Sequence, residues 1–174
     1  MKADFNSAFV ALRGLFYAVC FVALWSWIAL SVAPLDAALR ISVPNIVRVL
    51  GWPLGFGGAL ITAWCVGVFV TQGKGTPAPF DPPRKFVSRG PYRYMRNPMY
   101  VGALIVILGG GMILGSPSII GLSIAFGLLA HVFVLLYEEP TLEKTFGDSY
   151  RAYCSAVNRW VPSRSKITKK NNEL

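Results

Sequence analysis

The chain has 174 residues, of which 54% are hydrophobic and only 14% are charged, whereas roughly a quarter of the residues of a soluble domain are charged. Its net charge of +9 is compatible with nucleic-acid binding, but the basic residues lie beside hydrophobic segments, where Lys and Arg set topology and contact anionic headgroups. The composition excludes a soluble protein. It predicts an all-α integral membrane protein whose basic residues meet the lipid bilayer rather than nucleic acid.

Four apolar segments predict about four transmembrane helices within a single membrane domain, residues 1–174. They are residues 14–33, 49–71, 98–115 and 117–137, with a short polar lead at 1–13 and a short connection at 35–48. The second segment is rich in Gly, and small residues let helices approach closely in lipid, so we expect it to pack against another segment. Only the turn 116–118 separates the last two segments, which must therefore form an antiparallel hairpin.

The remaining parts of the chain are polar and basic. The loop 72–97 is dense in Pro, Lys and Arg, and the positive-inside rule places it and both termini on the cytoplasmic side. After Glu138-Glu139-Pro140, apolar residues recur at helical spacing, which predicts an amphipathic cytoplasmic helix at 141–157 that Gly147 can break. The basic tail 163–174 is expected to be disordered.

A basic, aromatic stretch runs directly into the third apolar segment at Asn97-Pro98. Asn is a preferred N-cap and Pro is suited to the first helical position, so a helix should begin there. Its free N–H groups would face Arg89, Arg93 and Arg96, an arrangement that suits an anionic or zwitterionic ligand. The alternative is a charged anchor at the membrane interface without a ligand.

Two adjacent carboxylates, Glu138 and Glu139, stand at the end of the fourth apolar segment. Carboxylates at the negative end of a helix dipole are unfavourable without a cationic partner. That partner could be Arg93, Arg96 or Arg151 in a structural ion pair. Alternatively, at least one carboxylate binds the ribose hydroxyls or a positive group of a cofactor. The hairpin brings these carboxylates and Asn97, about 40 residues away, to the same membrane level.

His131 is the only His and lies two helical turns before Glu138, so the two should share a helix face. A neutral His bonded to a neighbouring helix is an alternative to a catalytic one. No metal site is expected, because one His and three widely separated Cys residues make no recognisable ligand set.

Four motifs occur in order: Arg96-Asn97-Pro98-Met99-Tyr100-Val101-Gly102, Glu138-Glu139-Pro140-Thr141-Leu142, Phe146-Gly147-x-x-Tyr150-x-x-Tyr153 and Arg159-Trp160-x-Pro162. They resemble those of the isoprenylcysteine carboxyl methyltransferase and phospholipid methyltransferase superfamily, over residues 75 to about 162. The stretch 75–79 is similar to a bacterial branch of that superfamily. The resemblance implies a bundle of membrane helices that binds S-adenosylmethionine.

The resemblance also implies which residues form the site. The cofactor-binding residues would be Arg96, Asn97, Pro98, Tyr100, Gly102, Glu138, Glu139 and Leu142. Asn97 stands where the family usually has His, so this position supplies an amide and no imidazole. Glu138, Glu139 and His131 are the candidate proton acceptors, and Tyr92, Arg93 and Arg159 are expected to contact the acceptor substrate.

The implied function is methyl transfer to a lipid-like or amphipathic acceptor, in the inner membrane of a bacterium. A carboxylate acceptor needs no general base, whereas an amine or a thiol must lose a proton. One alternative is an NADPH-dependent membrane reductase resembling the steroid 5-alpha-reductases. Another is a non-catalytic membrane adaptor whose basic loops bind anionic lipid. The acceptor and the oligomeric state do not follow from the sequence.

Overall fold

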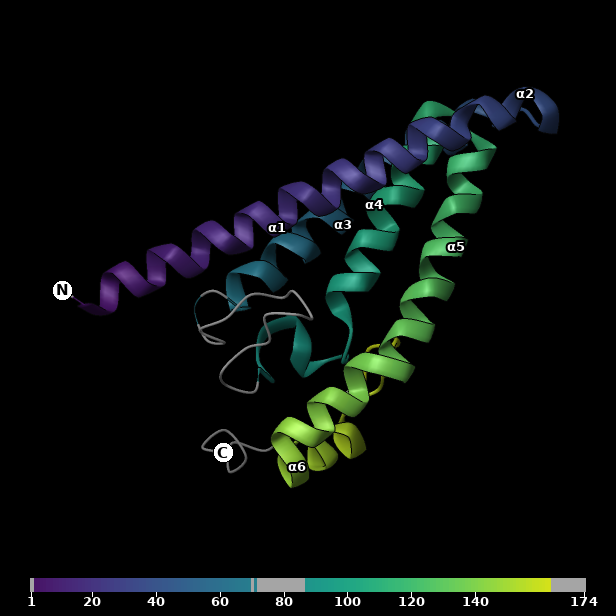
Figure 1. Ribbon diagram of the computed structural model, residues 1–174. Helices are drawn as coiled ribbons and strands as arrows, with labels where there is room; N and C mark the ends of the chain where they lie inside the picture. The colour runs from purple at the N-terminus through teal and green to yellow at the C-terminus, as the bar shows by residue number, and fades with distance from the viewer. Residues whose placement is uncertain (1, 70, 72–86, 164–174) are drawn as a thin grey trace.

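A computed structural model describes residues 2–69, 71 and 87–163, and these are helical, without a strand (Figure 1). The elements in chain order are α1 (Lys2–Val32), η1 (Ala33–Leu35), α2 (Asp36–Leu39), α3 (Asn45–Val68), η3 (Gly90–Arg93), α4 (Pro98–Leu114), α5 (Pro117–Phe133), the π-helix η4 (Val134–Glu138) and α6 (Glu139–Ala156). Three stretches, Leu12–Leu39, Asn45–Val68 and Pro117–Ala156, are long and apolar enough to cross a membrane, and α4 is a shorter apolar helix. The predicted all-α membrane fold is confirmed.

Some helix boundaries differ from those expected. The lead at 1–13 contains neither Gly nor Pro, and α1 continues through it from Lys2. The connection at 35–48 contains α2, and α3 begins at Asn45, directly after Pro44, instead of at residue 49. Most of the expected loop 72–97 and nearly all of the expected tail 163–174 lie outside the described residues.

Helices α3 and α4 pack backbone against backbone through their glycines. A Cβ atom added at Gly109 would lie 2.6 Å from the backbone nitrogen of Gly55, and one added at Gly58 would lie 2.7 Å from the carbonyl oxygen of Gly102. Such distances leave no room for a side chain, so glycine is required for this approach. The expectation that the Gly-rich segment packs against another apolar helix is confirmed.

A tight turn joins α4 to α5. Gly115 ends α4 with a φ of 68°, and the Ser116 hydroxyl accepts a hydrogen bond of 3.2 Å from the backbone N–H of Ile119. The Asp36 carboxylate accepts a hydrogen bond of 2.8 Å from the backbone N–H of Ser118, which ties α2 to the start of α5. The predicted hairpin is confirmed.

Helices α5 and α6 form one continuous rod through η4, instead of separating at Pro140. Proline lacks an N–H, and its ring clashes with the carbonyl four residues earlier in an α-helix. The wider π-helical turn directly before Pro140 relieves this clash, and π-turns are frequent at functional sites. The rod bends at Gly147, where φ is 53°, as predicted. The amphipathic helix thus spans 139–156 in place of 141–157.

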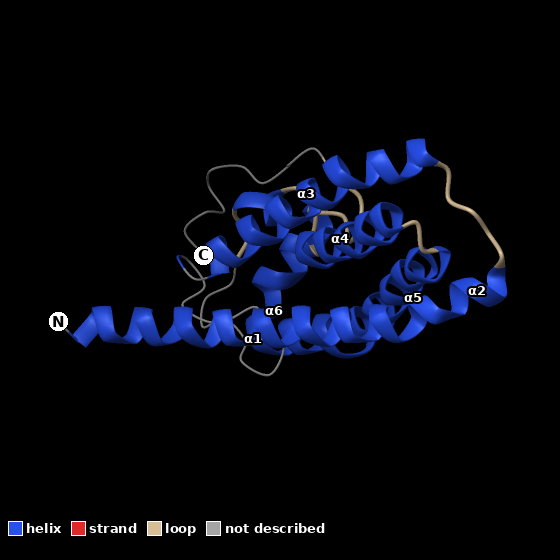
Figure 2. Cartoon of the chain, turned by 90° about the horizontal axis from the view of Figure 1, so that it is seen from above, coloured by secondary structure: helices blue, strands red, loops and turns tan. Residues whose placement is uncertain are grey.

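Helix α1 lies along one side of the bundle, with α3 and α4 on the other side (Figure 2). It approaches α5 near α2, and the two helices diverge toward the opposite end (Figure 1). Trp25 and Phe126 make the contact between them, with ring centroids 4.7 Å apart in an edge-to-face arrangement.

Candidate functional site

A cavity of about 230 Å³ is bordered by α1, α3, η3, the start of α4 and the end of η4. Its walls are mostly apolar side chains. The lining residues are Tyr17, Ala18, Phe21, Val22, Thr62, Val66, Phe69, Tyr92, Arg96, Asn97, Met99, Tyr100, Ala103 and Glu138. Polar and charged groups come from the segment just before α4, the first turn of α4 and the end of η4, an arrangement typical of ligand sites in a largely apolar lining. We call this group the polar end of the cavity: Arg96, Asn97, Tyr100 and Glu138.

Tyr100 and Glu138 form the link between the two predicted motifs. The Tyr100 hydroxyl donates a hydrogen bond of 2.8 Å to Oε2 of Glu138, and both residues line the cavity. Tyr100 stands in the first turn of α4 and Glu138 in the last residue of η4. The antiparallel hairpin therefore brings the two motifs together, as the sequence predicted.

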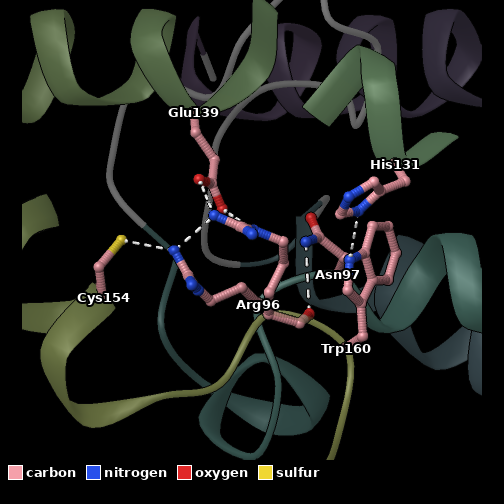
Figure 3. Close-up of polar contacts among 7 residues, drawn as sticks. Arg96, Asn97, His131, Glu139, Cys154 and Trp160 are labelled. Carbon is pink, nitrogen blue, oxygen red and sulfur yellow. Dashed lines mark hydrogen bonds and ion pairs between the residues drawn. The ribbon is translucent and has the colours of Figure 1, made fainter. Parts of the chain in front are cut away.

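Arg96 lies between Glu139 and Cys154 (Figure 3). Its Nη1 donates to Oε1 of Glu139 at 2.9 Å and to Sγ of Cys154 at 3.0 Å. Its Nε is buried and has no hydrogen-bond acceptor within the described part of the chain. Since leaving a buried donor unpaired is costly, this N–H in a residue that lines the cavity is suited to a ligand oxygen.

Glu139 accepts hydrogen bonds from two arginines. Arg159 donates through Nε to Oε1 and through Nη2 to Oε2, both at 2.8 Å, in addition to the bond from Arg96. The Glu139 side chain is 17% exposed, and its acceptance of these bonds raises the pKa of Arg159. Among the described residues that line the cavity, Glu138 is included and Glu139 is not, because consecutive helical residues point about 100° apart. The paired carboxylates thus face different surroundings.

Asn97 precedes the predicted helix start, but its side chain makes no cap hydrogen bond. Pro98 is fully buried at the first helical position, so the helix begins where expected. The prediction that the Asn97 side chain caps it is wrong. Nδ2 instead donates to the carbonyl oxygen of Arg159 at 3.3 Å, and the backbone N–H of Asn97 donates to the same oxygen. Both donors of Asn97 thus bind the C-terminal segment instead of capping α4.

Residues 157–163, which we call the C-terminal strap, follow α6 and pass beside the start of α4. The backbone N–H of Arg96 donates to the carbonyl of Asn158 at 2.9 Å, and the backbone N–H of Ser163 donates to that of Tyr94 at 2.8 Å. Trp160 Nε1 donates to Nδ1 of His131 at 3.0 Å (Figure 3). The strap is therefore fixed to α5 and to the segment that precedes α4.

His131 is held by this strap and does not join Glu138. It is absent from the described residues that line the cavity, although the spacing placed the two on one helix face. The π-helical turn between them changes the register on which that expectation depended. The non-catalytic interpretation expected a hydrogen-bond partner on a neighbouring helix, whereas the partner is Trp160 of the C-terminal strap.

The other predicted site residues divide between the cavity and the packing around it. Tyr92 lines the cavity, and burial raises the pKa of its phenol well above the usual value. Arg93 is exposed. Gly102 packs against Thr62 of α3, and Leu142 packs on the buried cluster of Tyr150, Tyr153 and Val157. Gly102 and Leu142 support the fold around the site.

Sequence reasoning missed the walls that α1 and α3 contribute, such as Tyr17, Phe21, Thr62 and Phe69. Helix α1 is apolar on all sides, so no periodicity distinguished a cavity face from a lipid face. The contact between Cys154 and Arg96 was also missed, because Cys154 occupies an apolar position in the repeat of α6.

The fold and the site define the class of protein. It is a bundle of membrane helices with a largely apolar cavity that has a polar end. Residues 46–149 match the model of the phospholipid methyltransferase family. The chain belongs to this family, as its motifs predicted. No solved structure matches it.

Several curated relatives match part of the chain. Phosphatidylethanolamine N-methyltransferase of Paracoccidioides lutzii is 35% identical over 72 residues, which are 41% of this chain and 7% of the relative. The probable protein-S-isoprenylcysteine O-methyltransferase of Oryza sativa subsp. japonica is 33% identical over 86 residues, which are 48% of this chain and 44% of the relative. An uncharacterized protein of Haemophilus influenzae is 39% identical over 64 residues, which are 36% of this chain and 100% of the relative. The chain therefore spans only a small part of the fungal relative's length.

Proposed function

We propose that the protein is an S-adenosylmethionine-dependent methyltransferase that acts on a lipid-like or amphipathic acceptor. The observation that carries this proposal is the polar end of the cavity, where Glu138 and Arg96 line an otherwise apolar space. The buried Nε of Arg96 has no hydrogen-bond acceptor among the described residues. Family membership and the names of the relatives support the same reaction class.

These residues fit the charges of the proposed cofactor. S-Adenosylmethionine carries a sulfonium and an ammonium group, which suit the carboxylate of Glu138. It also carries a carboxylate, which suits the buried N–H of Arg96. The Asn97 amide borders the same space. When bound, the cofactor supplies a methyl group on a positively charged sulfur.

The residues of the chain orient the reactants and exclude water. Tyr100 fixes one oxygen of Glu138 through their hydrogen bond, and alignment of bound reactants lowers the barrier to group transfer. For an amine or thiol acceptor, Glu138 is the carboxylate that borders the cavity and can accept the proton. A carboxylate acceptor needs no such step.

The apolar walls favour an acceptor with a hydrocarbon portion. Phe21 and Val22 of α1 and Val66 of α3 line the cavity, and burying apolar surface there stabilises a bound acyl or prenyl group. The positive-inside rule favours the cytoplasmic side for the basic segment that precedes α4, and this supports the same side for the polar end of the cavity. We propose the inner membrane of a bacterium as the location, with both termini in the cytoplasm.

A radiolabelled methyl-transfer assay tests the proposed function. Purified protein is mixed with the methyl-labelled cofactor and a total lipid and small-molecule extract, and the labelled product is identified. We expect label in a lipid fraction, lost in Glu138→Gln and retained in Glu143→Gln, whose exposed carboxylate pairs with Arg151 on α6. Label confined to water-soluble molecules would contradict the proposed acceptor class, and no labelled product would contradict the reaction.

A further inference from the structure

We infer that Glu139 and Arg159 are positioning residues that keep Arg96 away from Glu138, so that the charge of Glu138 stays available to a cationic ligand. This inference rests on the proposed function. It gives the two adjacent glutamates different roles: Glu138 faces the ligand, and Glu139 controls the arginine beside it.

The distribution of hydrogen bonds supports this division. Glu139 accepts three N–H bonds from Arg96 and Arg159, all between 2.8 and 2.9 Å. Glu138 accepts one from the neutral hydroxyl of Tyr100, and no ion pair to Glu138 is found among the described residues. Of the two adjacent carboxylates, Glu139 therefore holds the positive charge of both arginines.

Arg96 lines the same cavity as Glu138, while its Nη1 is bonded to Glu139. Removing the charge of Glu139 would leave Arg96 without its anionic partner. A carboxylate of opposite charge nearby attracts it strongly in a site of low dielectric. Arg96 would then pair with Glu138 and neutralise the polar end of the cavity.

Arg159 contacts both Glu139 and the residue next to Arg96. Its guanidinium binds Glu139 through two parallel bonds, a geometry that fixes direction as well as distance. Its carbonyl oxygen accepts from the backbone N–H and the side chain of Asn97, the residue next to Arg96. Through Arg159 the C-terminal strap thereby holds both Glu139 and Asn97. Arg159 thus orients Glu139 toward Arg96.

The test compares binding of S-adenosylmethionine with binding of its demethylated product, because the two differ in the positive charge on sulfur. Calorimetry in detergent gives both Kd values for wild type, Glu139→Gln, Arg159→Gln and the double variant. The preference for the charged ligand should fall at least about fivefold in Glu139→Gln. The preference of the double variant for the charged ligand should be no lower than that of Glu139→Gln. Glu143→Gln is the matched control and should retain the wild-type preference.

A purely structural role of Glu139 would lower stability without changing this preference. Thermal unfolding is therefore measured for each variant. Glu139→Asp keeps the charge and should keep most of the preference. If Glu139→Gln does not fold, Arg159→Gln, which removes the residue that orients Glu139, takes its place and should also lower the preference. An unchanged preference in folded Glu139→Gln, or a loss in Glu139→Asp as large as in Glu139→Gln, would overturn the inference. If wild type binds neither ligand, the proposed function itself fails, and this inference fails with it.

Discussion

Tyr100 and Glu138 are joined by a hydrogen bond of 2.8 Å from the phenol hydroxyl to Oε2 of the carboxylate. The bond connects the first turn of α4 to the end of the π-helix, at the polar end of the cavity. It fixes the direction of the carboxylate. The contribution of this bond to ligand binding can be separated from that of the charge.

Replacing Tyr100 with Phe removes the hydroxyl and keeps the ring. A net hydrogen bond contributes about 0.5–1.5 kcal/mol, so we expect the Kd for the methyl donor to rise by a factor of roughly 2 to 12. Calorimetry in detergent measures this change. Tyr137→Phe is the control, because that side chain is 48% exposed on the rod of α5 and α6. An affinity equal to that of wild type would show that Tyr100 does not orient Glu138.

Two adjacent glycines of α4 should respond very differently to alanine. A Cβ at Gly109 meets the backbone of Gly55 at 2.6 Å, whereas a Cβ at Gly110 meets nothing within 4 Å. We expect Gly109→Ala to destabilise the protein by about 1–3 kcal/mol through overpacking, and Gly110→Ala to leave stability unchanged or slightly raised. Unfolding in detergent compares the two variants. Equal stability of both would contradict the close packing of α3 on α4.

Local signals allowed much of the helical framework to be predicted from the sequence. Pro98 fixes a helix start because its ring suits the first turn, and Gly147 permits the positive φ at which the rod bends. The Gly-rich part of α3 indicated close packing because only small residues allow it. Each of these features depends on a residue and its immediate neighbours in the chain.

The details of the site depended on contacts that no local pattern contains. Asn97 could cap a helix or bind a distant carbonyl, and the strap decided between them by presenting Arg159. Glu138 and Glu139 have different partners because two arginines from other segments lie beside Glu139. The contribution of α1 to the cavity lining depends on how whole helices pack against one another. The sequence of a uniformly apolar segment does not reveal that packing.

His131 is expected to anchor the strap and not to act as a general base. His131→Phe removes the acceptor for Trp160 Nε1, and we expect kcat to fall by less than about fivefold, since loss of a general base costs about 10²–10⁴-fold. Trp160→Phe should produce a similar loss, and the double variant no more than either one. A hundredfold decrease in His131→Phe alone would assign the imidazole to catalysis.

Tyr92 should make stability depend on pH on the alkaline side. Because burial raises the pKa of its phenol, the unfolded chain releases this proton at lower pH than the folded protein. The contribution of Tyr92 to the free energy of unfolding is therefore complete below about pH 10. It is lost as pH rises from there through the higher folded pKa.

Unfolding measured from about pH 9 to pH 11 checks this expectation. Tyr92→Phe should lose less stability than wild type across this range. The exposed Tyr94 gives the matched control, Tyr94→Phe, which should follow the wild-type curve. Parallel curves for wild type and Tyr92→Phe would show that the phenol of Tyr92 is not buried.

Binding of S-adenosylmethionine to the purified protein in detergent tests the central claim most directly. Calorimetry should show saturable binding at one site, weakened at least about tenfold in Glu138→Gln, where the carboxylate at the polar end of the cavity is neutralised. Glu143→Gln should bind like wild type, because its carboxylate is exposed and paired with Arg151. Absence of saturable binding to folded wild-type protein, or equal affinity of wild type and Glu138→Gln, would contradict the account.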